Sequence, residues 1–219
     1  MSKAALLSSG KLPLHPLSPR QASAMDPKEA QWIQQCIELG HESIQRVLAM
    51  NASMKPSELV LRRGGTEASL YHKLIRYGVR SSATERPNGI GQGVANECFR
   101  NALKLLMRSR KAGAIAHYAE GLATSETVGY LPIHHGWLVD ENGKVIDNTW
   151  SDPQRSSYFG IVFRDDFIFS RHRRLRRGWE PVLEFLATDQ PLKLDDAAWE
   201  KMVLGPKASA QLHENAPSL

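Results

Sequence analysis

The sequence has few cysteines and no long apolar stretch, and each of these two features excludes some classes of protein. Cys36 and Cys98 are the only cysteines among 219 residues, so a disulfide framework is not expected and a reducing compartment is the default. No uninterrupted apolar run approaches the roughly 20 residues that span a bilayer. We therefore expect a soluble protein without a membrane span, located in the cytoplasm.

The first 25 residues contain no acidic side chain. They include several serines and prolines, and Leu6 and Leu7 alone do not form the apolar segment of a secretory signal. An organelle transit peptide has a similar acid-poor composition, but we favour a disordered tail or a start at Met25. The expected organisation is a tail over 1–25, a helical subdomain over 26–80, a catalytic core over 81–206 and a second tail over 207–219.

The composition, with 42% apolar and 23% charged residues, is ordinary for a globular protein. The net charge of +5 is unevenly distributed, because five arginines crowd into one short segment. Such a segment is either a solvated surface or a site for phosphate or an acidic partner. One candidate function is therefore the binding of nucleic acid or another anionic partner through Arg171, Arg173, Arg174, Arg176 and Arg177.

Helical patterns dominate the first part of the chain and its end. Asp26 can cap a helix, and apolar residues recur at helical intervals from there as far as about Asn51, with Cys36 among them. Cys36 is therefore interpreted as a core residue. A second helix is expected within 57–77, and a short one over 195–204.

The chain around Cys98 combines a loop with the start of a helix. Residues 80–93 are rich in Ser, Gly, Pro and Asn, which predicts a loop. Asn96 is a favourable N-cap, and an apolar stripe at helical spacing follows as far as Gly113. Cys98 then lies in the first helical turn, where unpaired backbone amides and the helix dipole stabilise an anion such as a thiolate.

Beyond Gly113 the apolar periodicity approaches two, which predicts strands. We expect these strands to form an antiparallel sheet on which the helix carrying Cys98 packs, with further helices at the N-terminus. The predicted fold class is α+β. The expected strands cover 115–122, 135–140, 144–149 and 158–163.

Three residues in sequence order have the side chains that a cysteine nucleophile requires. A thiol needs a base within hydrogen-bond reach, and the base needs a third group that orients its ring and stabilises its protonated form. Cys98 opens a helix, His135 opens a strand and Asp147 lies in the strand that returns. The sequence therefore predicts Cys98 as nucleophile, His135 as base and Asp147 as the orienting acid.

The length of the turn between the two strands decides whether His135 and Asp147 share a face. A two-residue loop would direct them to opposite faces, because side chains alternate along a strand. A three-residue loop of Glu141, Asn142 and Gly143 pairs Val139 with Val145 and brings His135 and Asp147 to one face. The catalytic hypothesis thus predicts the longer loop, with Gly143 in a left-handed conformation.

A family resemblance covers the segment from Gln92 to Phe163. It is carried by Cys98 at a helix start, Glu120-Gly121 at a strand end, His135-Gly136-Trp137, and the run from Val145 to Trp150. With these residues the segment resembles the core of the transglutaminase-like branch of the papain-like cysteine protease superfamily. The resemblance implies a papain-like core in which Cys98, His135 and Asp147 form the catalytic triad, and in which Gln92 donates to the oxyanion together with the Cys98 backbone amide.

Several candidates also have simpler structural interpretations. Cys98 can be an inert buried cysteine, and Gln92 can be a solvated loop residue. Trp137 and Trp150 are typical of core packing, which is compatible with a site wall that shields His135 from water.

Other histidines are expected to be structural. Alternation turns His134 to the face opposite His135, while His72 and His117 have no evident partner in the sequence. A metal site made of Cys98, His134, His135 and Asp147 is disfavoured, because the closely spaced ligand pairs of structural zinc are missing. We expect neither metal nor cofactor.

The pattern as a whole favours an enzyme that acts through a covalent acyl-thiol intermediate. This class includes cysteine peptidases, amidases, deamidases and transglutaminase-like acyltransferases. The expected substrate is a protein, a peptide, or a small amide or ester. The alternative is a non-catalytic protein that binds anionic partners through its arginine-rich segment 171–177.

Overall fold

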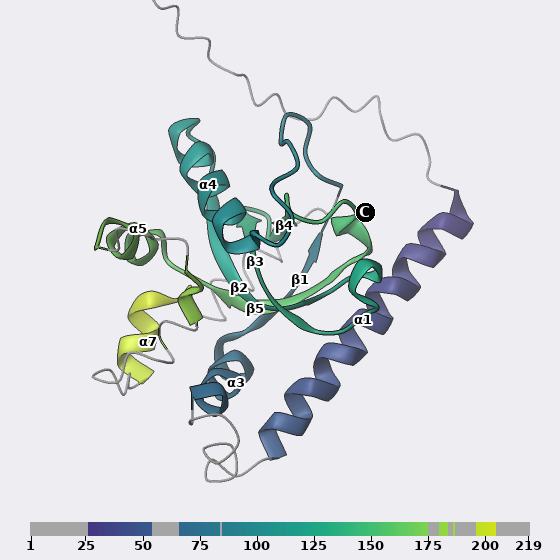
Figure 1. Cartoon of the computed structure of the whole chain (residues 1–219), viewed down its shortest axis with the longest axis horizontal. Coiled ribbons are helices and arrows are strands. Elements are labelled where there is room, and N and C mark those ends of the chain that lie inside the picture. Colours follow the sequence, from purple (N-terminus) through teal and green to yellow (C-terminus); the bar gives the residue numbers. More distant parts are fainter. Residues whose placement is uncertain are drawn as a thin grey trace, which may run out of the picture.

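The computed structural model describes residues 26–53, 66–83, 85–174, 180–183, 186 and 196–204. It confirms the α+β class, with five strands in a closed barrel and helices on its outside. Figure 1 shows α1 along one side of the barrel, with α4, α5 and α7 on the opposite side. The helices are α1 (Pro27–Ser53), α3 (Thr66–Tyr77), α4 (Cys98–Lys111), α5 (Asp165–Arg174) and α7 (Asp196–Met202), with short 3-10 turns η2 (Glu126–Val128) and η3 (Pro153–Arg155).

The strands are β1 (Val79–Ala83), β2 (Ala116–Thr124), β3 (Ile133–Asp140), β4 (Lys144–Ile146) and β5 (Ser157–Val162), and they close in the order β1-β4-β3-β2-β5. The prediction of an antiparallel sheet is wrong in two respects, because the sheet is a closed barrel and β1 pairs with β4 in parallel. The predicted loop over 80–93 is wrong at its start, because residues 80–83 belong to β1. Its sequence is mostly polar, yet it joins β4 to β5 and closes the barrel.

Alternation along the strands separates two apolar clusters. The inner cluster takes side chains from all five strands, which places it inside the barrel, and Trp137 and Tyr158 are its largest members. The outer cluster joins the other face of β2 and β3, including Tyr118 and Leu138, to the surrounding helices. His135 lies two residues before Trp137 on β3, so its side chain belongs to the inner face.

Helix α4 packs closely on the outside of β3, and its start differs from the prediction. Asn96 is not the N-cap: it adopts a left-handed conformation with φ of 62°, and Glu97 occupies the cap position without a side-chain hydrogen bond. A Cβ atom at Gly136 would lie 2.9 Å from Cδ1 of Phe99. The glycine therefore lets the first turn of α4, which begins at Cys98, approach β3 closely.

Helix α1 buries one stripe of residues at intervals of four: Cys36, Gly40, Ile44 and Leu48. The prediction that Cys36 is a core residue is confirmed, since its exposed fraction is 2%. A side chain at Gly40 would collide with Thr124 and Ser157, so the helix axis lies close to the ends of β2 and β5. No helix within the described ranges has the length and apolarity needed to cross a bilayer.

The β3–β4 hairpin has the register that the three-residue loop predicts. Val139 pairs with Val145, and Gly143 has φ of 75° and donates its backbone N–H to the Asp140 carbonyl at 3.1 Å. The predicted loop length and left-handed glycine are confirmed. Strand β4 ends at Ile146, earlier than expected, so Asp147 follows the strand directly.

Substitution of Gly143 should therefore destabilise the hairpin. Gly143→Ala forces a side chain into a left-handed conformation, which costs about 1–2 kcal/mol in the free energy of unfolding. The matched control is Gly91→Ala, because Gly91 has no positive φ and a Cβ atom added there would meet no other atom within 4 Å. Urea unfolding measures both variants, and equal stabilities would contradict the observed turn.

Candidate active site

A buried ion pair joins β3 to the residue that follows β4. Nε2 of His135 lies 2.8 Å from Oδ2 of Asp147, and both residues are 1% exposed. The hairpin register places Leu138 opposite Ile146. As a result, the side chains of His135 and Asp147 reach each other inside one end of the barrel. The structure thus brings together two of the three predicted catalytic residues at hydrogen-bond distance.

Asp147 is held by two further donors. The backbone N–H of Thr149 donates to Oδ1 at 2.7 Å, and the hydroxyl of Tyr158 donates to Oδ2 at 3.0 Å. Burial by itself raises the pKa of the Asp147 carboxyl, but the charge of His135 and these hydrogen bonds outweigh it and lower that pKa below its ordinary value. The carboxylate is therefore ionised and fixed in position.

Aromatic rings enclose the imidazole of His135. Trp150 stacks on it with a centroid distance of 4.2 Å and an interplanar angle of 16°. Trp137 lies further away at 6.3 Å, nearly parallel to the imidazole. The two tryptophans suggested by the sequence as a site wall thus border His135, and they limit the access of water to its bond with Asp147.

Cys98 lies near the same imidazole. It is the first residue of α4 and is 8% exposed. Its sulfur is close enough to contribute to the raised pKa of His135. Since Nε2 of His135 is taken by Asp147, Nδ1 is the ring nitrogen left for the sulfur.

The imidazole is a strong base in this setting. Burial opposes protonation of His135, but the charge and hydrogen bond of Asp147, together with the Cys98 thiol, raise its pKa to about 9. A histidine with this pKa carries a proton at neutral pH. The arrangement can therefore hold an imidazolium beside a sulfur atom, with a carboxylate behind it.

The raised pKa of His135 predicts a pH-dependent stability. Its folded pKa of about 9 exceeds the ordinary 6.5, so the stabilisation is fully present below about pH 6.5 and is lost as the pH rises through 9. We expect the difference in free energy of unfolding between wild type and His135→Gln to fall by on the order of 3 kcal/mol over this interval. Urea unfolding at pH 6, 7.5 and 9.5 measures it. A difference that stays constant with pH would contradict the assigned proton.

Asn101 is a positioning residue that the sequence interpretation missed. It lies one turn after Cys98 on α4 and is 3% exposed. Its side-chain amide donates to the Val94 carbonyl at 2.7 Å and to Oγ1 of Thr149 at 3.1 Å, and its oxygen accepts the Val94 N–H at 3.1 Å. A side chain at Gly93 would collide with this amide. Asn101 therefore ties α4 to the loop before it and to the segment that carries Asp147.

A sequence signal for Asn101 exists, although it is weak. The residue is polar and lies three positions after Cys98, within the otherwise apolar face of the helix. A buried asparagine must find hydrogen-bond partners, and residues three apart lie on one face of a helix. Asn101 is thus expected on the same helix face as Cys98, but the sequence does not identify its hydrogen-bond partners.

Loss of the Asn101 amide should affect both stability and the site. Asn101→Ala removes three hydrogen bonds and leaves buried partners unsatisfied, which costs on the order of 2 kcal/mol. We also expect roughly tenfold slower alkylation of Cys98 by iodoacetamide in the folded protein, because the thiol and Asp147 lose their common support.

The controls for this experiment are Thr149→Val, which removes only the Thr149 hydroxyl, and Asn88→Ala in the exposed loop. We expect an intermediate effect for the first and none for the second. Reduced stability of Asn101→Ala with an unchanged alkylation rate would assign the residue a structural role alone.

Gln92 lies exposed in the loop before α4. Its neighbour Gly93 donates its backbone N–H to the Asn148 carbonyl at 2.6 Å, which joins this loop to the segment after Asp147. The described side-chain hydrogen bonds include none from Gln92 to another residue. Its role as an oxyanion donor stays a prediction.

His134 and His117 each lie close to an acidic side chain. Nε2 of His134 lies 2.7 Å from Oε1 of the buried Glu120, a close contact without hydrogen-bond alignment, and its ring packs against Phe99. His134 is thus on the outer face, as alternation predicts. His117 has a partner that the sequence did not reveal, because its Nδ1 lies 3.1 Å from Oδ1 of Asp165. The side chain of His72 falls outside the described residues.

Glu120 has a structural role on the outer face. Its carboxylate accepts the Tyr118 hydroxyl at 2.8 Å and the backbone N–H groups of Val182 and Leu183 at 2.7 and 2.9 Å. These bonds attach the described C-terminal segment to the barrel. They also explain why a fully buried carboxylate is tolerated at this position.

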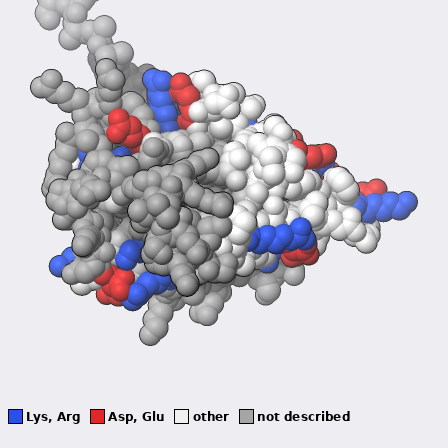
Figure 2. Space-filling view, turned by 60° about the horizontal axis from the view of Figure 1, so that its bottom comes forward, with Lys and Arg blue, Asp and Glu red and all other residues white. Residues whose placement is uncertain are grey.

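Only part of the arginine-rich segment is described. Arg171 is 6% exposed and donates to the carbonyls of Glu180 and Pro181, so its guanidinium faces protein. The side chains of Arg173 and Arg174, and the whole of Arg176 and Arg177, lie outside the described residues. On the face shown in Figure 2, basic and acidic side chains of the described residues lie next to one another. Anion binding by this segment stays a prediction.

Within the described ranges, no three His, Cys, Asp or Glu side chains are grouped in a way that could hold a metal ion. Comparison of the chain with protein-family models, with curated proteins and with solved structures finds no significant match. The function is therefore argued from the geometry of the site.

Proposed function

We propose that this protein is a thiol-dependent acyl-transfer or amide-hydrolysing enzyme with Cys98 as nucleophile, His135 as base and Asp147 as orienting acid. One observation carries the proposal: His135 is bonded through Nε2 to a buried carboxylate at 2.8 Å, and Cys98, at the start of α4, is near enough to the same ring to help raise its pKa. This is the arrangement that an activated cysteine requires.

Acylation begins with the thiolate of Cys98 and the imidazolium of His135. The sulfur attacks the carbonyl carbon of an amide, ester or thioester, and a tetrahedral oxyanion forms. As the bond to the leaving group breaks, His135 donates its proton to that group. The product is a thioester on Cys98 and a neutral imidazole.

Deacylation reverses the roles of the same groups. Water or an amine attacks the thioester carbon and gives a proton to Nδ1 of His135, and the C–S bond breaks to restore the thiolate. Asp147 stays ionised throughout and stabilises the imidazolium whenever it forms. Water as acceptor makes the enzyme a hydrolase, and an amine makes it an acyltransferase.

The oxyanion needs donors close to Cys98. The backbone N–H of Cys98 is one of the unpaired amides at the start of α4, and Gln92 is a second donor if its loop turns the exposed amide toward the sulfur. Two such donors in a site shielded from water lower the barrier by several kcal/mol.

A core similar to the transglutaminase-like branch of the papain-like superfamily is part of the proposal. It is supported by the order of Cys98, His135 and Asp147 in the chain and by a helix that begins at the cysteine and packs on the strand carrying the histidine. The hydrogen bond between Nε2 of His135 and Asp147 leaves Nδ1 for the sulfur, which is compatible with this resemblance.

Alkylation of the thiol tests the proposal without knowledge of the substrate. At pH 5.5 an unperturbed thiol is only about 0.1% ionised, so fast reaction with iodoacetamide reports a stabilised thiolate. We expect Cys98 to react at least about tenfold faster than N-acetylcysteine in the same tube. Mass spectrometry of the digested protein separates Cys98 from Cys36, and Cys36 serves as the internal buried control.

Two variants assign the cause of the reactivity. His135→Ala removes the imidazolium and should reduce the rate to that of N-acetylcysteine or below, and Asp147→Asn should give an intermediate rate. If Cys98 in the wild type reacts no faster than N-acetylcysteine, or if His135→Ala leaves its rate unchanged, the proposed function is wrong.

A further inference from the structure

A pocket adjoins the site at Trp150. Its volume is about 140 Å³, and it is lined by Ser125, Glu126, Thr127, Trp150, Asp152 and Arg155. A cavity of about 150 Å³ accommodates benzene, so this pocket has room for about six non-hydrogen atoms. Trp150 also stacks on His135 at 4.2 Å. Trp150 is therefore both a wall of the pocket and a direct neighbour of the catalytic imidazole.

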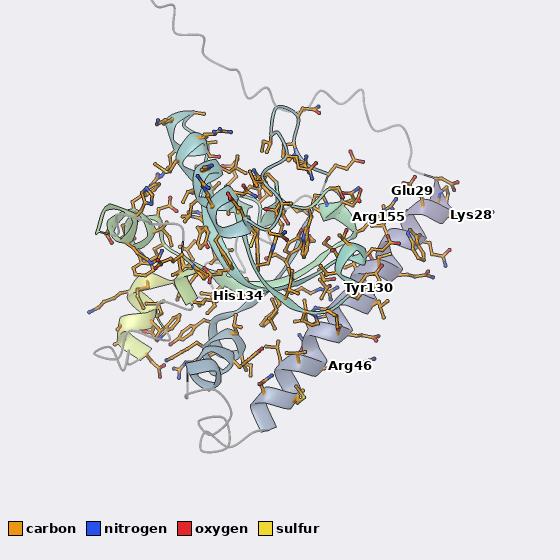
Figure 3. The ribbon with its side chains drawn as sticks, viewed as in Figure 1. Lys28, Glu29, Arg46, Tyr130, His134 and Arg155 are labelled. Atoms are coloured by element: carbon orange, nitrogen blue, oxygen red, sulfur yellow. The ribbon has the colours of Figure 1, made fainter. Side chains whose placement is uncertain are left out.

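The charges around the pocket favour a cation. Glu126 and Asp152 contribute two carboxylates, against the single guanidinium of Arg155. That guanidinium already has an anionic neighbour, because its Nη2 lies 3.7 Å from Oε1 of Glu29 on α1. Figure 3 shows Arg155 directed toward the first turns of α1, with Glu29 beside it. Glu126 and Asp152 are exposed, and the pocket carries one more carboxylate than the single guanidinium of Arg155 can balance.

Two neutral features of the wall suit an ammonium group. Ser125 is 4% exposed, and its Oγ has no hydrogen-bond partner among the described residues, so it offers lone pairs to a donor. The indole of Trp150 provides an aromatic face, on which a cation is stabilised by the ring quadrupole. A primary ammonium ion has three donors and fits both features.

We propose that this pocket binds a primary ammonium group of the substrate. Its assignment as a substrate subsite rests on the proposed function, whereas ammonium binding as such does not. The ammonium can belong to the amino-terminal residue of a peptide or to an alkylamine that accepts the acyl group. Nε of Arg155 has no acceptor among the described residues, and an amide carbonyl next to the ammonium would supply one, which favours the peptide terminus.

Helix α1 supports the outer side of this pocket. Tyr130 follows η2 in a left-handed conformation with φ of 58°, and burial together with the nearby Cys36 of α1 raises the pKa of its hydroxyl to about 12. Gly40 allows α1 to contact Thr124, the residue before Ser125. The N-terminal helix therefore positions the turn from which Ser125, Glu126 and Thr127 line the pocket.

The proposal is tested by titrating the full chain with small amines at pH 6.5, followed by ligand-observed NMR. Alaninamide represents a peptide amino terminus and pentylamine an alkylamine acceptor, while 1-pentanol and pentanoate are the neutral and anionic controls. We expect both amines to bind saturably, alaninamide more tightly, and both controls to bind more weakly.

The variants locate the binding. Glu126→Gln and Asp152→Asn should each raise the dissociation constant of alaninamide by about two- to fivefold. The matched control is Glu42→Gln, because Glu42 forms an exposed pair with Arg46 elsewhere on α1. This change should have no effect.

The outcomes separate this proposal from the proposed function. Binding of 1-pentanol or pentanoate as tight as that of the amines, or equal effects of Glu126→Gln, Asp152→Asn and Glu42→Gln, would overturn the ammonium site while leaving the reactivity of Cys98 unaffected. Tighter binding of pentylamine than of alaninamide retains the site and assigns the ammonium to an acceptor amine. Amine binding in a protein whose Cys98 reacts no faster than a free thiol retains the site and removes the catalytic role.

Discussion

The buried contact between His135 and Asp147 is the interaction on which the site depends. Either group alone inside the barrel would be costly, because an unpaired buried charge loses its hydration without compensation. Together they satisfy each other, and Thr149 and Tyr158 complete the bonds of the carboxylate. Trp137 and Trp150 exclude water around the pair, which strengthens the interaction further.

The position of the thiol depends on contacts outside the barrel. Gly136 lets the first turn of α4 approach β3, and Asn101 connects that helix to the loops on either side of the site. Cys98 therefore comes from a helix on the outer face, while His135 comes from the inner face of a strand. Only the end of the barrel, where β3 begins and β4 finishes, allows the two to meet.

Local rules predicted the parts of this arrangement that depend on few residues. The loop of Glu141, Asn142 and Gly143 fixes the hairpin register, because glycine tolerates the left-handed conformation and alternation then determines the faces. The burial of Cys36 follows from apolar residues at helical intervals in the same local way. These features needed no information about distant parts of the chain.

Features that depend on distant contacts were not predictable from local patterns. Strand β1 is polar at most positions, so its own sequence does not predict a strand. It is extended because it pairs with β4 on one side and with β5 on the other. Asparagine is a residue type typical of helix caps, yet Asn96 adopts a left-handed conformation in the turn before Cys98. The cap position is therefore taken by the next residue, Glu97. Thr149, which bonds Asn101, and Asp165, which bonds His117, each lie 48 residues away from their partner, beyond the reach of any periodicity.

The most direct test of the account is the titration of His135 by NMR, with the histidine side chains labelled with ¹⁵N. The account predicts a pKa near 9, with the proton on Nε2 bonded to the Asp147 carboxylate at every pH at which the protein is folded. It also predicts a lower value in Cys98→Ala, because the thiol helps to raise it. Titration of His135 near 6.5, unchanged by removal of the thiol, would contradict it.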